Sequence, residues 1–225
     1  MHIEPGIVEG PKIVLSYLTA SGVGAYTLSL ASKHIKERGA ASLLAGVVAT
    51  TALVFTFFQV FPHVAVGISE VHLILGSTLF LLFGAAPAAF GLALGLLVQG
   101  VFFAPFDLPQ FGMNVTTLLV PLLALQAVAR RTIAPQTPYV DLKYRQALAL
   151  SATYQAGIVS WVTFWALYGQ GFTVENVASI ATFGVAYMSV ILLEPLADLL
   201  VLAGAKAVRS LRDGAWLEPR LFNPA

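Results

Sequence analysis

The sequence contains no cysteine and few charged residues. Charged residues make up only 10% of the 225, whereas hydrophobic residues make up 58%. Without cysteine the chain has no disulfide, no thiolate metal site and no cysteine nucleophile. Soluble domains carry about 25% charged residues, and the mean hydropathy of this chain is +0.83. The composition therefore excludes an ordinary soluble globule and predicts a polytopic membrane protein built from helices.

Several motifs of catalysis and binding are also missing. The sequence contains no GxxxxGK[ST] phosphate loop, no HExxH zinc motif and no GxSxG nucleophile elbow. The formal net charge of +1 gives no electrostatic reason to bind nucleic acid. We therefore predict a chain that is not an enzyme, holds no tight cofactor and does not hydrolyse ATP. Because no basic region precedes the first apolar run, we also expect no signal peptide, so that Met1 remains on the mature chain.

Seven apolar segments are present, and they predict an all-α protein with about seven transmembrane helices. Their approximate bounds are 12–32, 40–61, 72–84, 86–103, 114–130, 145–169 and 175–207. The third segment would rise only about 20 Å as a helix, which is short of the roughly 30 Å hydrocarbon core. We therefore expect it to start inside the membrane, below a loop that dips in from one side. This predicts a membrane domain over 1–207 and a cytoplasmic tail over 208–225, loosely ordered from Asp213 onward.

The basic residues predict the orientation. Eleven of the twelve Lys and Arg residues follow the first, fifth and seventh segments, which seven crossings place on one side of the membrane. Lys12 alone lies on the other side. The positive-inside rule then puts the C-terminus in the cytoplasm and the N-terminus outside, in a bacterial inner membrane.

The N-terminus is the first candidate site. The chain begins Met1-His2-Ile3, and the α-amine, the His2 amide nitrogen and the His2 imidazole can close two fused chelate rings on one metal ion. His72 is a second candidate, because an ionisable group within a spanning segment marks a functional site by default. We expect His72 to open the third helix with Ser69 as its N-cap, and its neutral imidazole suits a first-row divalent ion.

Two further polar features allow a structural and a functional interpretation. Asn114, at the start of the fifth helix, either holds backbone groups together or hydrogen-bonds a ligating imidazole. Glu194 and Asp198 share one face of the last helix. They could form a proton relay, an ion path or a patch that faces a partner. From their place near the cytoplasmic end, we expect a solvated pair instead.

With these residues assembled, the chain resembles the CbiM/NikM family, the substrate-specific membrane components of energy-coupling factor (ECF) transporters for cobalt and nickel. The resemblance covers roughly residues 1–205. It is carried by Met1-His2-Ile3 with Gly6, Gly67-x-Ser69 leading to His72-Leu73, the Gly84/Pro87 break, and Gly112-Met113-Asn114-Val115.

The resemblance implies seven helices with an external N-terminus inserted into the bundle. It also implies a planar site of four nitrogens, three from Met1 and His2 and the fourth from His72, with Asn114 in support. The usual Gly-Thr-Ser-x-His stretch here gains one residue and includes Glu70. Glu70 either adds an oxygen ligand that shifts preference toward cobalt or merely attracts cations. We interpret His63 as a loop residue or one on the path by which the ion enters.

The resulting interpretation is a subunit that captures Co²⁺ or Ni²⁺ as a transported substrate. By resemblance, a transmembrane coupling protein and ATPase subunits would supply the transport energy. Two alternatives remain open at this stage. One is a secondary permease for a metal or small solute that works alone, with Glu194 and Asp198 as its proton groups. The other is a structural membrane protein without substrate.

Overall fold

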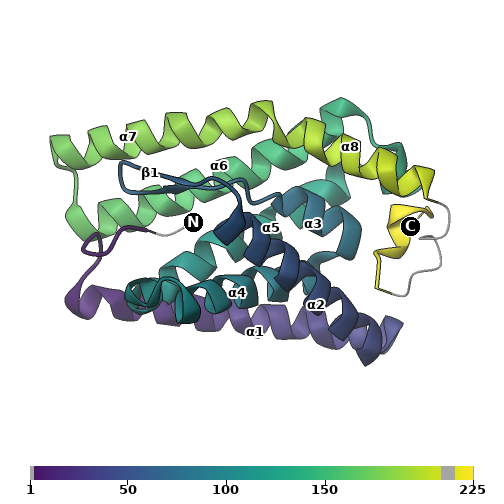
Figure 1. Cartoon of the computed structure of the whole chain (residues 1–225), viewed down its shortest axis with the longest axis horizontal. Coiled ribbons are helices and arrows are strands. Elements are labelled where there is room, and N and C mark those ends of the chain that lie inside the picture. Colours follow the sequence, from purple (N-terminus) through teal and green to yellow (C-terminus); the bar gives the residue numbers. More distant parts are fainter. Residues whose placement is uncertain (1–2, 209–215, 225) are drawn as a thin grey trace.

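The computed structural model describes residues 3–208 and 216–224. Long helices run along one axis, with shorter ones between them (Figure 1). The helices are α1 (Ile13–Arg38), α2 (Ala40–Phe55), α3 (Gly76–Phe83), α4 (Ala85–Phe102), α5 (Phe111–Thr132), α6 (Tyr144–Gln170), α7 (Val174–Met188) and α8 (Glu194–Ala207). The predicted all-α class is confirmed, with one short β-hairpin added.

Five described segments are long and apolar enough to cross a membrane. They are Gly10–Arg38, Ala40–Val60, Ala85–Phe102, Pro105–Thr132 and Val174–Ala207. The last comprises α7 and α8, which the 3₁₀ turn η5 (Ser189–Leu192) joins where one continuous helix was expected. The number of crossings and the orientation of the termini stay predictions.

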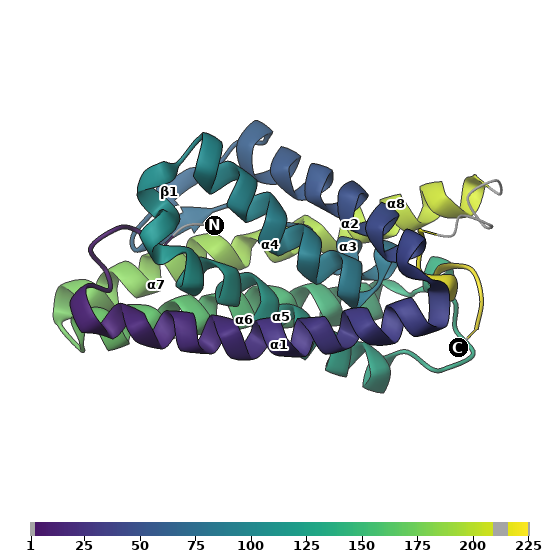
Figure 2. The same ribbon diagram turned by 90° about the horizontal axis from the view of Figure 1, so that it is seen from below.

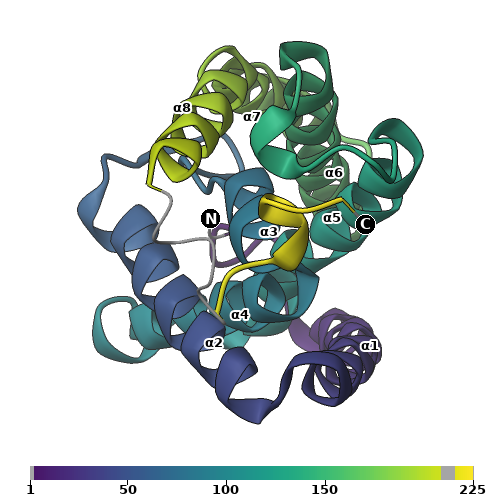
Figure 3. The same cartoon turned by 90° about the vertical axis from the view of Figure 1, so that its right-hand side faces the viewer.

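The bundle has two distinct ends. The 3₁₀ turn η1 (Gly10–Lys12), the 3₁₀ segment η3 (Pro105–Gln110) and the α6–α7 turn lie together at one end, which we call the hairpin end (Figures 1 and 2). The α1–α2 turn, the α3–α4 junction and the α5–α6 connection lie at the other, which we call the C-terminal end. Seen along the axis, α3 occupies the centre of the bundle (Figure 3).

The helices α2 and α4 approach closely because of two glycines. A Cβ placed on Gly91 would lie 2.2 Å from Thr50 Oγ1, and one on Gly95 would lie 2.5 Å from a Val54 methyl. The Thr50 hydroxyl also donates a 2.8 Å hydrogen bond to the Pro87 carbonyl. Small residues at this spacing allow helix backbones to meet, as the GxxxG pattern predicts for membrane helices.

The third helix is shorter than predicted. It begins at Gly76, not at 72, and the residues before it form a hairpin of β1 (Val64–Val66) and β2 (Ser69–Val71). The expected role of Ser69 as a helix N-cap is therefore wrong, because Ser69 belongs to a strand. The predicted break before the fourth helix is confirmed at Gly84, which has φ +83°.

The predicted loose tail is also wrong where the structure describes it. Residues 216–224, which we call the C-terminal segment, lie across the C-terminal end over α3 (Figure 3). Leu217 and Leu221 are buried, and the Glu218 backbone amide donates a 2.7 Å hydrogen bond to the Leu82 carbonyl. Apolar burial and a backbone hydrogen bond therefore fix a segment whose composition is that of a tail.

Candidate metal-binding site

His72 lies in the four-residue link between β2 and α3. Its side chain is 1% exposed, so the imidazole is inside the protein although it does not begin a helix as expected. The link ends at Leu75, which has the left-handed values φ 55° and ψ 39°. Such a conformation costs a leucine roughly 1–3 kcal/mol and persists only where neighbouring structure enforces it. The chain is thus held in a defined path just beyond His72.

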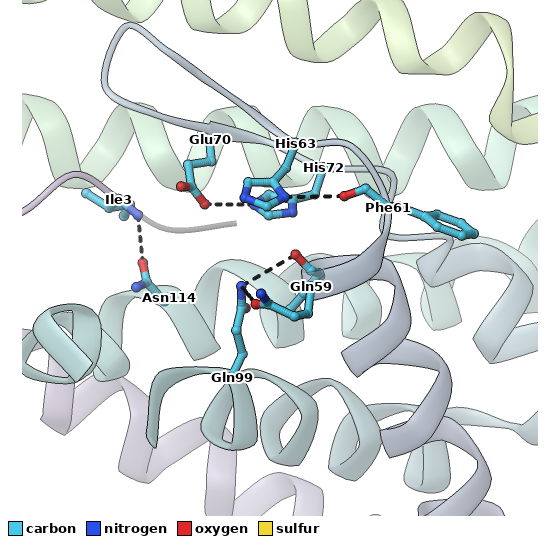
Figure 4. A network of polar contacts seen from close by, with 9 residues as sticks. Ile3, Gln59, Phe61, His63, Glu70, His72, Gln99 and Asn114 are labelled. Carbon is cyan, nitrogen blue, oxygen red and sulfur yellow. Dashed lines mark hydrogen bonds and ion pairs between the residues drawn. The ribbon is translucent and has the colours of Figure 1, made fainter. Parts of the chain in front are cut away.

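Two side chains of the hairpin region surround the His72 ring. The Nε2 atom of His72 lies 2.8 Å from Glu70 Oε2 (Figure 4). The ring of His63 stacks on that of His72, with centroids 4.9 Å apart and planes 9° apart. Phe58 packs on it with a centroid distance of 5.4 Å. The structure therefore brings together His63, Glu70 and His72, three residues that the sequence analysis named for the metal site and its entry path.

The hairpin is seated against α7 through its turn. Gly67 has φ +62°, and a Cβ on it would lie 2.4 Å from the Ser179 carbonyl oxygen. Only glycine fits both the left-handed backbone and this close approach. Because the turn is fixed in this way, the position of β2 is fixed as well, and with it the positions of Glu70 and His72.

The N-terminal segment enters the bundle beside β2. Ile3 is 0% exposed and forms an isolated antiparallel bridge with Ser69, which is also buried. The Glu4 amide donates a 3.2 Å hydrogen bond to the Ile68 carbonyl. On the other side, the Ile3 amide donates a 2.9 Å hydrogen bond to Asn114 Oδ1 (Figure 4). Asn114 thus holds the backbone of the N-terminal segment.

A second contact anchors the same segment at the hairpin end. Lys12 Nζ donates to the carbonyl oxygens of Tyr168 and Gly169, at 3.0 and 2.9 Å. A cation suits this place because the last carbonyls of a helix carry partial negative charge. Val8, between the two anchors, is 1% exposed. The segment from Ile3 to Lys12 is consequently fixed at both ends.

The first two predicted ligands, Met1 and His2, lie outside the described residues. Within residues 3–208 and 216–224, no group of three or more His, Asp or Glu side chains is placed to hold a metal ion. A metal ion at His72 would therefore need further ligands besides the described His, Asp and Glu side chains. The predicted ligand set of Met1, His2 and His72 stays a prediction.

The site region is acidic. Burial, together with the negative charge of Glu70, raises the pKa of the Glu4 carboxyl above its usual value. Carboxyl groups at this end thus repel one another, and a cation would relieve that repulsion.

Two amides near the site escaped the sequence analysis. Gln99, on α4, is buried and lies with its amide nitrogen 3.4 Å from the Phe58 carbonyl and 3.5 Å from Gln59 Oε1 (Figure 4). Both glutamines interrupt otherwise apolar helices. A polar residue in a spanning segment is the sequence signal that could have marked them as site candidates.

The C-terminal end offers a different cavity. It measures about 440 Å³, and its lining includes Lys33, Arg38 and Arg130 together with the carboxyl groups of Glu37 and Glu218. The lining carries more positive than negative charge, which disfavours capture of a divalent cation. The hairpin end is therefore the better candidate.

Comparison with known proteins identifies a family and two similar folds. Residues 2–211 match the CbiM family, described as the cobalt uptake substrate-specific transmembrane region. One crystal structure, of a transition metal transporter, has a TM-score of 0.65 and 16% identity, and the match covers 92% of this chain and 93% of that one. A structure of a truncated transition metal transporter has a TM-score of 0.64 and 16% identity, with 92% and 99% covered. No curated protein matches the chain.

Proposed function

Because the chain belongs to the CbiM family of cobalt-uptake membrane components, we propose that it is the substrate-capture subunit of an ATP-driven uptake transporter for cobalt or nickel. It is a multi-pass membrane component of metal transport and not an enzyme. The proposal adds the ligands: the α-amine of Met1, the amide and imidazole nitrogens of His2, and the imidazole of His72.

The docking of Ile3 carries this proposal. Ile3, the first described residue, pairs with Ser69 in an antiparallel bridge, and Ser69 lies three residues before His72. Consecutive Cα atoms are about 3.8 Å apart, so Met1 and His2 lie within about 8 Å of the Ile3 Cα. An N-terminus held in this way can reach the His72 imidazole.

The neighbours of His72 suit a metal ligand. A carboxylate that bonds one nitrogen of an imidazole fixes its tautomer and raises its basicity, and Glu70 makes such a contact at 2.8 Å. His63 stacks on the ring and limits its rotation. In this proposal Glu70 and His63 orient His72, and His63 also stands on the path of the incoming ion.

The ligand set favours particular ions. Four nitrogens in a plane suit Ni²⁺ or Cu²⁺, whereas an added carboxylate oxygen is better accepted by Co²⁺ in a site of higher coordination number. Because the His2 amide must lose its proton, we expect binding to weaken as the pH falls.

The transport energy has to come from other subunits. We propose a transmembrane coupling protein and ATPase subunits of the ECF type, since the sequence carries no phosphate loop. In the predicted orientation the hairpin end faces outward in a bacterial inner membrane and receives the ion there, and the C-terminal end meets these partners.

The decisive experiment replaces His2 with alanine. The substitution removes the imidazole and the chelate ring that it closes, so isothermal titration of the purified full chain with Ni(II) and Co(II) should show tight binding in the wild type that the variant loses. His34→Ala is the control, because it removes an imidazole from the C-terminal end, and it should bind as the wild type does. Equal binding by all three proteins would place the metal elsewhere.

A further inference from the structure

Two carboxyl groups lie buried between α3, α6 and α8. Glu194, the first residue of α8, and Asp198, one turn later, are each 0% exposed. The expectation of a solvated pair is therefore wrong. Ionisable groups inside a membrane bundle are expensive and mark ion or proton paths by default.

The groups that donate hydrogen bonds to these carboxyl groups carry no charge. Glu194 Oε1 accepts from the Leu75 amide at 3.0 Å, and Oε2 accepts from the Ser151 hydroxyl at 2.7 Å. Asp198 Oδ1 accepts from the Thr78 hydroxyl. Among the described residues, no Lys, Arg or His forms an ion pair with either group. These hydrogen bonds offset part of the cost of burying each carboxyl group, but no positively charged side chain among the described residues pairs with it.

Further polar atoms in the same cluster have no hydrogen-bond partner in the described part of the chain. They are Asp198 Oδ2 and the hydroxyls of Tyr154 and Tyr187, all on side chains that are 0% exposed. A Cβ on Gly76 would lie 2.3 Å from the Tyr154 carbon that bears the hydroxyl, which places that end of the ring one residue from Leu75. Buried polar atoms left in this way require an explanation such as an ion or water.

The cluster is linked to the candidate site by a short stretch of chain. Glu194 holds the amide of Leu75, the left-handed residue three positions after His72. Beyond Leu75, α3 runs through the centre of the bundle toward the C-terminal end (Figures 1 and 3). Along this stretch Glu194 contacts Leu75, and Asp198 contacts Thr78 three residues later.

We propose that Glu194 and Asp198 form a second cation site, which binds a divalent cation through oxygen ligands. Two carboxylates balance a double positive charge, and the hydroxyls of Thr78 and Ser151 supply additional oxygens. Carboxylate and hydroxyl oxygens suit hard divalent ions such as Mn²⁺. The identity of the physiological occupant as the transported metal rests on the proposed function. The existence of the site does not.

The test uses Mn(II), because a site of amine, amide and imidazole nitrogens binds this ion poorly and an oxygen site binds it well. Titration of the purified full chain, followed by the loss of the free Mn(II) electron paramagnetic resonance signal, should show one bound ion per chain. Asp198→Asn and Glu194→Gln keep side-chain shape and should weaken binding at least about tenfold, the factor that corresponds to 1.4 kcal/mol. Glu175→Gln removes the same charge from an exposed position on α7 and should leave binding unchanged.

The outcomes separate this proposal from the previous one. The His2→Ala chain should keep Mn(II) binding even if it loses Ni(II). A wild-type chain that binds no Mn(II) overturns the second site and leaves the two carboxyl groups as protonated structural groups. Binding that survives both Asp198→Asn and Glu194→Gln also overturns it. Should these variants fail to fold, Ser151→Ala removes one oxygen without changing charge and should weaken Mn(II) binding, and unchanged binding contradicts the proposal.

Discussion

The two ends of the described chain are both docked into the bundle, at opposite ends and by different forces. At the hairpin end, Ile3 is held by backbone hydrogen bonds with an uncharged amide and with β2. At the C-terminal end, the backbone hydrogen bond from Glu218 to Leu82 is joined by a charged side chain, because Arg38 donates to the Leu217 carbonyl and lies 3.6 Å from Glu218 Oε2. Arg220 donates to the carbonyls of the α5–α6 connection.

This difference indicates different roles. Backbone hydrogen bonds are directional and set the register of the N-terminal segment, as is needed to present ligands at a fixed distance. Ion pairs are less directional and depend on pH and salt. We therefore expect changes at the hairpin end to alter metal affinity and changes at the C-terminal end to alter stability.

The largest effect should come from His72→Gln. The proposed site loses one of four ligands, so the affinity for Ni(II) or Co(II) should fall by more than the roughly 10–100-fold that loss of an orienting partner causes. Isothermal titration measures this. His63→Gln removes an exposed imidazole that only stacks on the ring, and its effect should stay below about tenfold. Equal losses in the two variants would contradict the assignment of His72 as the ligand.

Asn114→Ala should have the next largest effect. The variant removes the acceptor of the Ile3 amide, so the N-terminal segment loses its fixed position and metal affinity should fall about 10–100-fold. Asn114→Asp keeps an oxygen acceptor and should retain most of the affinity. If both variants bind as the wild type does, docking of Ile3 does not control the site.

Arg38→Ala should lower stability and spare metal binding. The guanidinium that holds the C-terminal segment is lost, which should cost roughly 1–3 kcal/mol in the free energy of unfolding. Thermal unfolding in detergent measures the loss, and titration should show unchanged metal affinity. A large change in metal affinity would show that the two ends are coupled.

The loss of stability in Arg38→Ala, relative to the wild type, should depend on pH. Burial raises the pKa of Glu218 above its usual value, and the positive charge of Arg38 opposes that rise. Without Arg38 the pKa in the folded state rises further. A carboxyl group with a raised folded pKa contributes stability below its unfolded pKa and loses it as the pH rises through the folded value. The deficit of Arg38→Ala should therefore be larger at about pH 8 than at about pH 5.

The long helices and the break at Gly84 could be predicted from the sequence, because apolar runs and a helix-ending glycine act on neighbouring residues. The hairpin was missed because strands of three residues are too short to show alternation.

The burial of Glu194 was missed for a different reason. Its partners Leu75 and Ser151 lie 119 and 43 residues away in the sequence, so no local sequence pattern predicts these contacts. The same long-range contact holds Leu75 in its left-handed conformation. The late start of α3, and with it the non-helical position of His72, is thus a tertiary effect that a single sequence does not reveal.

The smallest effect, that of Lys33→Ala, tests whether position or net charge governs docking at the C-terminal end. Lys33 and Arg38 are on the same helix and carry the same charge, but the Lys33–Glu37 pair spans 3.8 Å between side chains that are 66% and 58% exposed. Exposed pairs of this kind contribute about 0.3–0.5 kcal/mol. Lys33→Ala should therefore shift the unfolding midpoint far less than Arg38→Ala does. Equal shifts would mean that the summed positive charge of this end stabilises the protein, and that the buried contacts of Arg38 with the C-terminal segment do not.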